Sequence, residues 1–88
     1  MNVTFRPTAW DDYRHWPERD AKLYDKLHAL IEECRRHPFK GTGKSEPLGS
    51  NLSGWWSCQI SHEHRLVYRV AGSGGEQVLQ AAQCRYHY

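Results

Sequence analysis

After Gly54 the sequence contains three strand-like runs whose separations are too short to hold a helix. The runs cover residues 55–60, 65–70 and 78–86, and each is rich in aliphatic and aromatic residues. Parallel neighbours in a sheet need a crossover of about a dozen residues or more, whereas antiparallel neighbours need only a turn. The pattern therefore predicts that the three runs pair as antiparallel neighbours.

The middle run predicts that the two faces of this sheet differ. Side chains of a strand alternate between its faces, which separates two sets of residues: Leu66, Tyr68 and Val70 on one face, Arg65, Val67 and Arg69 on the other. We expect helices to cover the first face and the second face to be open and basic. Of the adjacent pair Trp55 and Trp56, one is expected in the core and the other on the open face.

A helical period marks the segment before residue 38. Five apolar residues fall on one stripe of period 3.6: Leu23, Leu27, Leu30, Ile31 and Cys34. The helix is predicted to stop near Arg36 or His37, because Pro38 disfavours helical geometry in the residue before it.

The N-terminal residues predict a short strand followed by a short helix. Residues 3–5 form the strand, Thr8 is the expected N-cap, and Asp11 lies in the capping-box position. Helical spacing assigns three aromatic residues to the core: Trp10, Tyr13 and Trp16. Pro17 is expected to break or kink the helix.

These elements predict one α+β domain over residues 1–88, with two N-terminal helices packed on one face of a small twisted antiparallel sheet. A chain of 88 residues matches a single domain. Residues 38–54 are rich in Gly, Pro, Ser and Asn, and predict a loop with one short strand near residues 46–48.

Charge is distributed unevenly along the chain. Through Cys34 there are five Lys or Arg and seven Asp or Glu, a balance of −2, and from Arg35 onward seven against three, a balance of +4. The second half therefore favours a polyanionic partner. No apolar run approaches the roughly 18 residues of a bilayer span, and no signal peptide begins the chain, so a soluble cytoplasmic protein is expected.

Two familiar motifs are incomplete. Residues 41–45 suggest a phosphate-binding loop, but Pro38 occupies the position of its first glycine, and the segment follows a helix. His62, His64 and Cys58 could start a metal site, with Cys84 and His87 as distant partners, but no ligand spacing joins the pairs. We therefore expect no metal and no other cofactor, and a turn with solvated histidines.

Six blocks of sequence, spread from residue 10 to residue 88, form an ordered set. They are Trp10-Asp11-Asp12-Tyr13, Arg35-Arg36-His37-Pro38-Phe39-Lys40-Gly41, Gly43-Lys44-Ser45-Glu46-Pro47-Leu48, Leu52-Ser53-Gly54, Glu63-His64-Arg65-Leu66-Val67-Tyr68 and Arg85-Tyr86-His87-Tyr88. In this order and spacing the set resembles the YoeB (Txe) toxins of the RelE superfamily, over the whole chain.

The resemblance implies a toxin of a type II toxin–antitoxin pair that cuts mRNA at the ribosomal A site. It implies the RelE-like, microbial-ribonuclease-like fold of two helices against a twisted antiparallel sheet. It places catalysis on Glu46, Arg65 and His87, with Tyr88 beside them in the substrate site. The implied partners are a YefM-like antitoxin, the 70S ribosome and its mRNA, and a second copy of the chain, without a membrane.

The implied trio suits metal-independent cleavage of RNA by its own 2′-OH. A carboxylate can take the 2′ proton, a guanidinium can bind the phosphate oxygens, and an imidazolium can protonate the departing 5′ oxygen. Our hypothesis assigns these roles to Glu46, Arg65 and His87, in that order.

The sequence departs from the family pattern at positions that are basic in the family. Cys58 and Gln59 stand where the family usually has Arg-Arg, and Gly49 where it often has lysine. We expect Lys44 and Arg69 to bind substrate and to offset part of this loss. The loss permits one alternative, a catalytically weak paralogue that acts as a protein-binding module. A second alternative is a gyrase-poisoning toxin on the same fold, against which the joint presence of Glu46, Arg65 and His87 stands.

Overall fold

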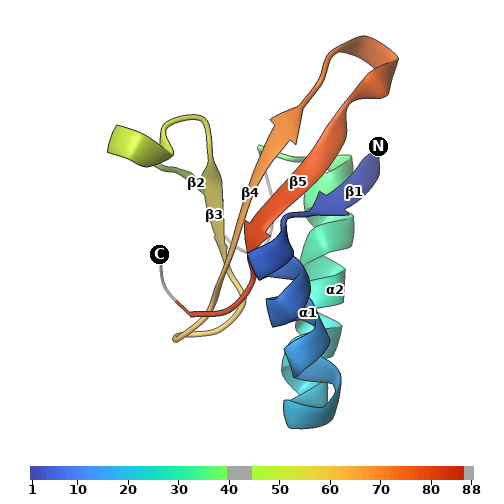
Figure 1. Cartoon of the computed structure of the whole chain (residues 1–88), viewed down its shortest axis with the longest axis vertical. Helices are drawn as coiled ribbons and strands as arrows, with labels where there is room; N and C mark the ends of the chain where they lie inside the picture. The colour runs from blue at the N-terminus through green and yellow to red at the C-terminus, as the bar shows by residue number, and fades with distance from the viewer. Residues whose placement is uncertain (40–44, 87–88) are drawn as a thin grey trace.

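The computed structural model describes residues 1–39 and 45–86. Helices α1 (Pro7–Arg19) and α2 (Ala21–Arg36) lie side by side and cover one face of a five-stranded sheet (Figure 1). The strands are β1 (Asn2–Phe5), β2 (Glu46–Pro47), β3 (Trp56–Gln59), β4 (Arg65–Ala71) and β5 (Val78–Gln83). Short 3₁₀ helices, η1 (Ser50–Leu52) and η2 (Gly74–Glu76), lie in the connections before β3 and β5. The predicted α+β class is confirmed.

The sheet has the strand order β1-β5-β4-β3-β2 and is mixed. The predicted antiparallel pairing of the last three strands is confirmed, and β2 also pairs antiparallel, with β3. The expectation of a wholly antiparallel sheet is wrong at one edge, because β1 pairs in parallel with β5. Short turns dictate direction only between consecutive strands, whereas β1 reaches β5 through every other element of the fold.

Helix α1 differs from its prediction at both ends. It begins at Pro7 with Arg6 as the N-cap, so Thr8 is not the cap. Proline is favoured in the first helical turn because its missing N–H would have no partner there. Pro17 lies inside the helix, which continues to Arg19. Trp16 is buried as predicted, but Trp10 is 46% exposed and lies outside the core.

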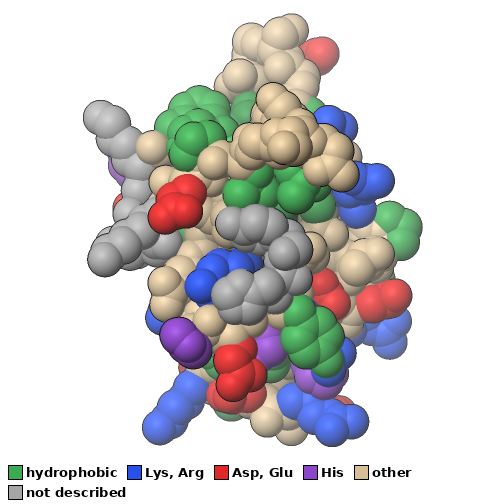
Figure 2. Space-filling view, turned by 90° about the vertical axis from the view of Figure 1, so that its left-hand side faces the viewer, with side chains coloured by type: hydrophobic (Ala, Val, Ile, Leu, Met, Phe, Trp, Pro, Cys, Tyr) green, Lys and Arg blue, Asp and Glu red, His purple; other side chains and the backbone are tan. Residues whose placement is uncertain are grey.

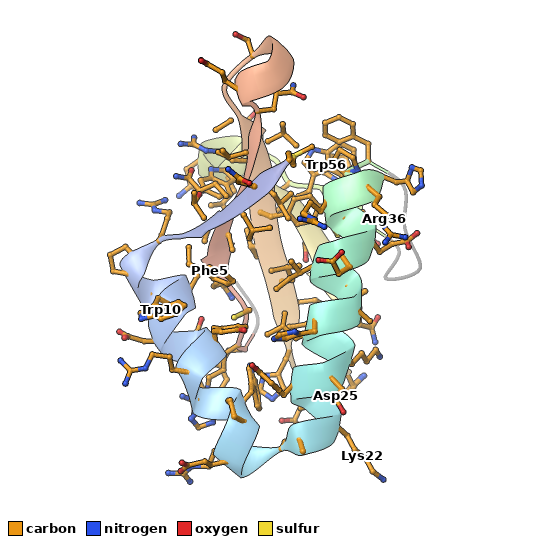
Figure 3. The ribbon with its side chains drawn as sticks, turned by 90° about the vertical axis from the view of Figure 1, so that its right-hand side faces the viewer. Phe5, Trp10, Lys22, Asp25, Arg36 and Trp56 are labelled. Atoms are coloured by element: carbon orange, nitrogen blue, oxygen red, sulfur yellow. The ribbon has the colours of Figure 1, made fainter. Side chains whose placement is uncertain are left out.

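Helix α2 follows its apolar stripe and ends at Arg36, as predicted. Its first turn is capped by the Asp20 side chain, which accepts a hydrogen bond from the Leu23 N–H at 3.1 Å. Lys22, Asp25 and Arg36 point away from the sheet into solvent (Figure 3). Neither helix, at 13 and 16 residues, is long and apolar enough to cross a membrane, and the rest of the described chain adds no such helix.

The core fills the space between the helices and the sheet, and Trp56 belongs to its edge. The opposite face is more covered than the alternation predicts. Val67 is only 2% exposed, and Trp55 is only 8% exposed. The Arg69 guanidinium lies 4.6 Å from the Trp55 ring centre, and that of Arg6 lies 5.7 Å away. This face is therefore partly covered by Trp55, and the guanidinium groups of Arg69 and Arg6 lie over its ring.

Candidate active site

Glu46 stands exposed at the edge of the sheet, on the two-residue strand β2. It pairs with Ser57 on β3, and Ser57 pairs in turn with Val67 on β4. Directly paired residues of antiparallel strands point to the same face. Glu46 therefore lies on the face that the helices leave uncovered.

Arg65 begins β4 on that same face, two residues before Val67. Its Nη1 donates to three backbone carbonyl oxygens of the β3–β4 turn: Ser61 at 2.6 Å, His62 at 3.2 Å and His64 at 3.1 Å. Across the described chain, its Nε and Nη2 donate to no protein group. Within residues 1–39 and 45–86, the guanidinium is thus fixed at Nη1 and has no acceptor at its other two nitrogens.

The sheet register brings Glu46 and Arg65 near each other without pairing them. They are separated by two strand spacings and by two residues along the strand, so their Cα atoms lie roughly 12 Å apart. That separation leaves room for a phosphodiester between the ends of two long side chains. The face seen in Figure 2 carries acidic as well as basic side chains, and it is not a uniformly basic surface.

The chain after β5 turns toward Arg65. The Tyr86 carbonyl oxygen accepts a hydrogen bond from the Arg65 N–H at 3.0 Å. Figure 1 shows this last part of the described chain running beside the β3–β4 turn. His87 and Tyr88 lie outside the described residues, but they follow Tyr86 directly in sequence. The structure thus brings together Glu46, Arg65 and the point at which the C-terminal residues begin.

Two further residues, Arg69 and Lys44, were predicted to bind substrate. Arg69 lies on the same face as Arg65, four residues further along β4, and its Nε donates to Gln80 Oε1 at 2.7 Å. Its guanidinium is therefore engaged with Gln80 and Trp55. Lys44 lies outside the described residues. Within residues 1–39 and 45–86, no three His, Cys, Asp or Glu residues are grouped to hold a metal ion.

A network of thiol and hydroxyl groups lies behind Glu46. Ser45, which precedes it, donates from Oγ to Cys58 Sγ at 3.7 Å, and Cys34 Sγ donates to the same sulfur at 3.9 Å. The hydrogen bond from Cys34 lowers the pKa of Cys58 to about 7, while burial opposes that shift. The Tyr68 hydroxyl contacts Ser45 Oγ at 3.0 Å and the Pro38 carbonyl oxygen. The network ties β2 to α2, β3 and β4.

Groups on α1 hold the other side of the C-terminal turn. Asp12 Oδ2 accepts a hydrogen bond from the Cys84 N–H at 3.1 Å, and Trp16 Nε1 donates to the Cys84 carbonyl oxygen at 2.9 Å. Burial raises the pKa of Asp12, although the bond from Cys84 and the charge of Arg85 oppose the shift. Burial, together with the charge of Asp12, raises the pKa of the Cys84 thiol to about 12.

His64 is a residue whose place the sequence did not reveal. The expected solvated histidine has a side chain only 12% exposed, and its Nδ1 accepts a hydrogen bond from the Tyr86 N–H at 2.8 Å. The two residues are 22 positions apart, and no periodic pattern reports such a contact. The only signal was the resemblance of residues 63–68 to a family block.

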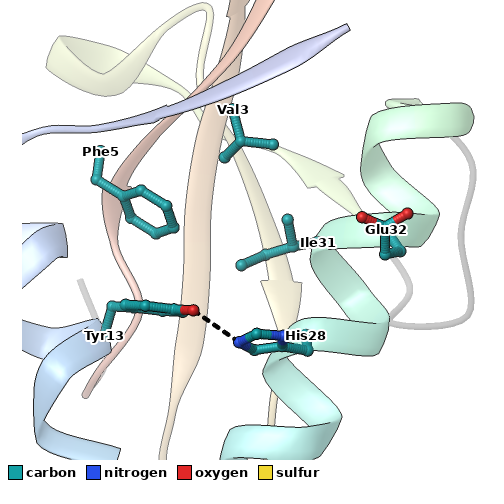
Figure 4. Close-up of a pocket in the computed structure, with 6 residues that line it drawn as sticks. All are labelled: Val3, Phe5, Tyr13, His28, Ile31 and Glu32. Atoms are coloured by element: carbon teal, nitrogen blue, oxygen red, sulfur yellow. Dashed lines mark hydrogen bonds between the residues drawn. The ribbon is translucent and has the colours of Figure 1, made fainter.

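A separate cavity of about 150 Å³ lies between β1 and the two helices (Figure 4). Strand β1 is at the opposite edge of the sheet from β2, which carries Glu46. Tyr13 and His28 close one side of it through a hydrogen bond of 2.8 Å. Its remaining lining is Val3, Phe5, Ile31 and Glu32. Of the predicted catalytic residues that the structure describes, neither Glu46 nor Arg65 lines it.

The fold places the chain in a known class. The DinJ–YafQ complex of Escherichia coli contains a chain that superposes with a TM-score of 0.77 at 16% identity, covering 99% of this chain and 93% of that one. At that identity only the fold is shared. The family model and the relatives at 48% identity place a chain of this fold in the RelE/ParE superfamily.

Closer relatives identify the family within that class. A family model described as "YoeB-like toxin of bacterial type II toxin-antitoxin system" matches residues 5–88. Toxin YoeB of Escherichia coli K12 is 48% identical over 88 residues and is covered fully, as is this chain. A YoeB/ParE toxin from Agrobacterium tumefaciens superposes with a TM-score of 0.96 at 48% identity, with both chains fully covered. The chain belongs to the YoeB family of toxins.

Solved relatives also record assemblies. A YoeB–YefM complex from Staphylococcus aureus contains a chain that superposes with a TM-score of 0.87 at 39% identity, covering 100% of this chain and 98% of that one. A YoeB dimer from the same organism has been solved as well.

Proposed function

We propose that this chain is a ribosome-dependent endoribonuclease that cuts mRNA at the codon in the A site. The observation that carries the proposal is the arrangement on one face of the sheet. The Glu46 carboxylate and a fixed Arg65 guanidinium share that face, and the C-terminal residues begin beside Arg65. Membership of the YoeB family supports the same proposed function.

The proposed reaction is a transesterification within the RNA. Glu46 takes the proton of a 2′-OH, whose oxygen attacks the adjacent phosphorus, while Arg65 Nε and Nη2 stabilise the charge that develops on the phosphate oxygens. His87 gives a proton to the 5′ oxygen as its bond to phosphorus breaks. The products are a 2′,3′-cyclic phosphate and a 5′-OH, and the proposed steps pass through these three side chains without a metal.

The fixed geometry of Arg65 suits this role. A guanidinium that is already bonded to three backbone carbonyls loses little side-chain freedom when it binds a phosphate. Gln59, which pairs with Arg65, and Gly49 leave the region less positive than is usual in the family. We therefore propose that Lys44, Arg69 and Tyr88 contribute substrate contacts, with weaker binding than in relatives that keep the basic residues.

The proposed partners follow from the family. A YefM-like antitoxin would bind this toxin as a disordered segment that folds over the uncovered face and masks the C-terminal residues. The S. aureus relatives form both a YoeB–YefM complex and a YoeB dimer, which supports an antitoxin partner and a homodimer for this chain.

Primer extension on mRNA in a purified bacterial translation reaction tests the proposal. Wild type should cut mRNA only when ribosomes are present. Glu46→Gln and His87→Ala should each cut about 10²- to 10⁴-fold more slowly, because each removes one proton-transfer group. Glu76→Gln is the matched control, since Glu76 is an exposed carboxylate in the β4–β5 connection.

Two outcomes would overturn the proposal. Cleavage by Glu46→Gln at the rate of Glu76→Gln would remove Glu46 from the mechanism. Intact mRNA with folded wild-type protein would favour a protein-binding module, a role that Gln59 and Gly49 permit because they lower the positive charge of the site.

A further inference from the structure

The Tyr86 backbone is fixed on both sides by residues of the β3–β4 region. His64 Nδ1 accepts its N–H at 2.8 Å, and its carbonyl oxygen accepts from the Arg65 N–H at 3.0 Å. Tyr86 has a φ of +63°, a left-handed conformation that a residue with a side chain adopts only at some cost. These two hydrogen bonds, with a longer one from Gln83 Nε2 to the same carbonyl oxygen at 3.4 Å, offset that cost and hold the Tyr86 backbone beside Arg65.

The His64 ring is itself fixed from the core. It packs edge-on against Trp16, with the ring centres 4.6 Å apart, and Trp16 is only 4% exposed. Trp16 also donates from its indole N–H to the carbonyl oxygen of Cys84, two residues before Tyr86. Glu63 lies 4.0 Å from His64 Nε2 but is 81% exposed, so it adds little. The ring is therefore held by Trp16.

The hydrogen bond to Tyr86 defines the state of the ring. An imidazole nitrogen accepts a hydrogen bond only when it carries no proton, so the neutral His64 ring carries its proton on Nε2. A phenylalanine would keep the packing on Trp16 but lose the acceptor. An asparagine would keep an acceptor oxygen the same number of bonds from Cα as Nδ1.

We infer that His64 is a positioning residue, whose Nδ1 fixes the Tyr86 backbone beside Arg65 and thereby supports the proposed cleavage. His64 does not touch the reacting atoms in this scheme and acts through the backbone of Tyr86. The inference rests on the proposed nuclease function for its activity measurement. Its structural part, the fixing of Tyr86 by Nδ1, stands without that function.

The experiment compares His64→Phe with His64→Asn. In the ribosome-dependent cleavage reaction, His64→Phe should lower kcat about 10- to 100-fold with KM within about threefold of wild type, because displacement of a catalytic group slows the chemical step. His64→Asn should recover most of that loss. Hydrogen exchange of the Tyr86 amide should be slow in wild type and His64→Asn, and at least tenfold faster in His64→Phe.

Each other result overturns the inference. Equal kcat for His64→Phe and wild type would show that the bond does not position the reacting residues. Equal losses in both variants would assign the effect to the ring rather than to its acceptor. If wild type does not cut mRNA, the exchange measurement decides, and an unprotected Tyr86 amide refutes the fixing of Tyr86. If His64→Phe does not fold, His64→Gln replaces it, since its acceptor lies one bond further from Cα.

Discussion

At the scale of single residues, Gln59 is the position where a change of charge should act most directly on the site. It is exposed and pairs with Arg65 across β3 and β4. Gln59→Arg adds a positive charge beside the proposed phosphate position. We expect a three- to tenfold lower KM for mRNA cleavage at low salt, and a smaller difference at high salt, because screening weakens contacts with phosphate.

Gln77→Arg is the matched control for this prediction. Gln77 is also exposed, but it lies in the β4–β5 connection, just before β5. The substitution makes the same change in net charge away from Arg65. If both variants lower KM equally, the effect belongs to the net charge of the protein and not to the site.

Cys84 should make the stability of the fold fall at alkaline pH. Its pKa in the folded protein is raised from 9.0 to about 12, by burial first and by the charge of Asp12 second. Its contribution to stability is therefore complete below pH 9 and is lost as the pH rises from about 9 to 12, where the unfolded chain has already released the proton. In this range the free energy of unfolding should fall by up to about 1.4 kcal/mol per pH unit from this thiol.

Cys84→Ser tests that assignment, because a serine hydroxyl does not ionise in this range. Urea unfolding of the reduced protein should give a shallower alkaline slope for the variant, and parallel curves between pH 6 and pH 8. Parallel curves above pH 9 as well would show that the Cys84 thiol is not the group responsible.

At the scale of elements, Asp20 connects the two helices. Its N–H donates to the Trp16 carbonyl oxygen at the end of α1, and its side chain caps α2 through the Leu23 N–H. Asp20→Ala should lower the free energy of unfolding by about 1 kcal/mol, which is typical of a lost N-cap. Asp25→Ala, at an exposed position on α2, is the comparison and should cost clearly less in the same urea titration. A cost equal to that of Asp20→Ala would contradict the capping role.

The elements also separate what the sequence could predict from what it could not. The α2 stripe was reliable because five apolar residues share one period, and four of them are buried: Leu27, Leu30, Ile31 and Cys34. The predicted start of α1 rested on a single capping pattern at Thr8. The helix instead begins one residue earlier, at Pro7. Val67 alternates correctly with its neighbours, yet it is buried on the face expected to be open, because burial there depends on residues from other strands.

The sequence could nominate residues for the candidate site but could not give their geometry. Glu46 and Arg65 were identified as candidate catalytic residues only by the resemblance to a family. A two-residue strand such as β2, which carries Glu46, has no periodic signal of its own. Their common face follows only from the register of three strands. The fixing of Tyr86 by His64 and Arg65 depends on a turn of the chain that no local pattern encodes.

At the scale of the whole molecule, the site depends on parts of the chain that are made at different times. β2 and β3 supply the edge that carries Glu46, β4 supplies Arg65, and α1 supplies the Asp12 and Trp16 contacts that hold the turn after β5. We therefore expect a substitution far from Glu46, such as one at Trp16, to act on the proposed site through the backbone.

The parallel pairing of β1 with β5 bears on how such a chain is produced in a cell. β1 is the first strand synthesised, and β5 follows every other helix and strand of the described fold. Until the ribosome has added residues from Val78 onward, β5 is absent. Strand β1 then has no partner in the sheet and β4 is paired only with β3, so the sheet is incomplete. Contacts between residues this distant in sequence also form slowly. The nascent chain therefore completes its sheet only near the end of its own translation, and the face that we propose to be catalytic is completed with it.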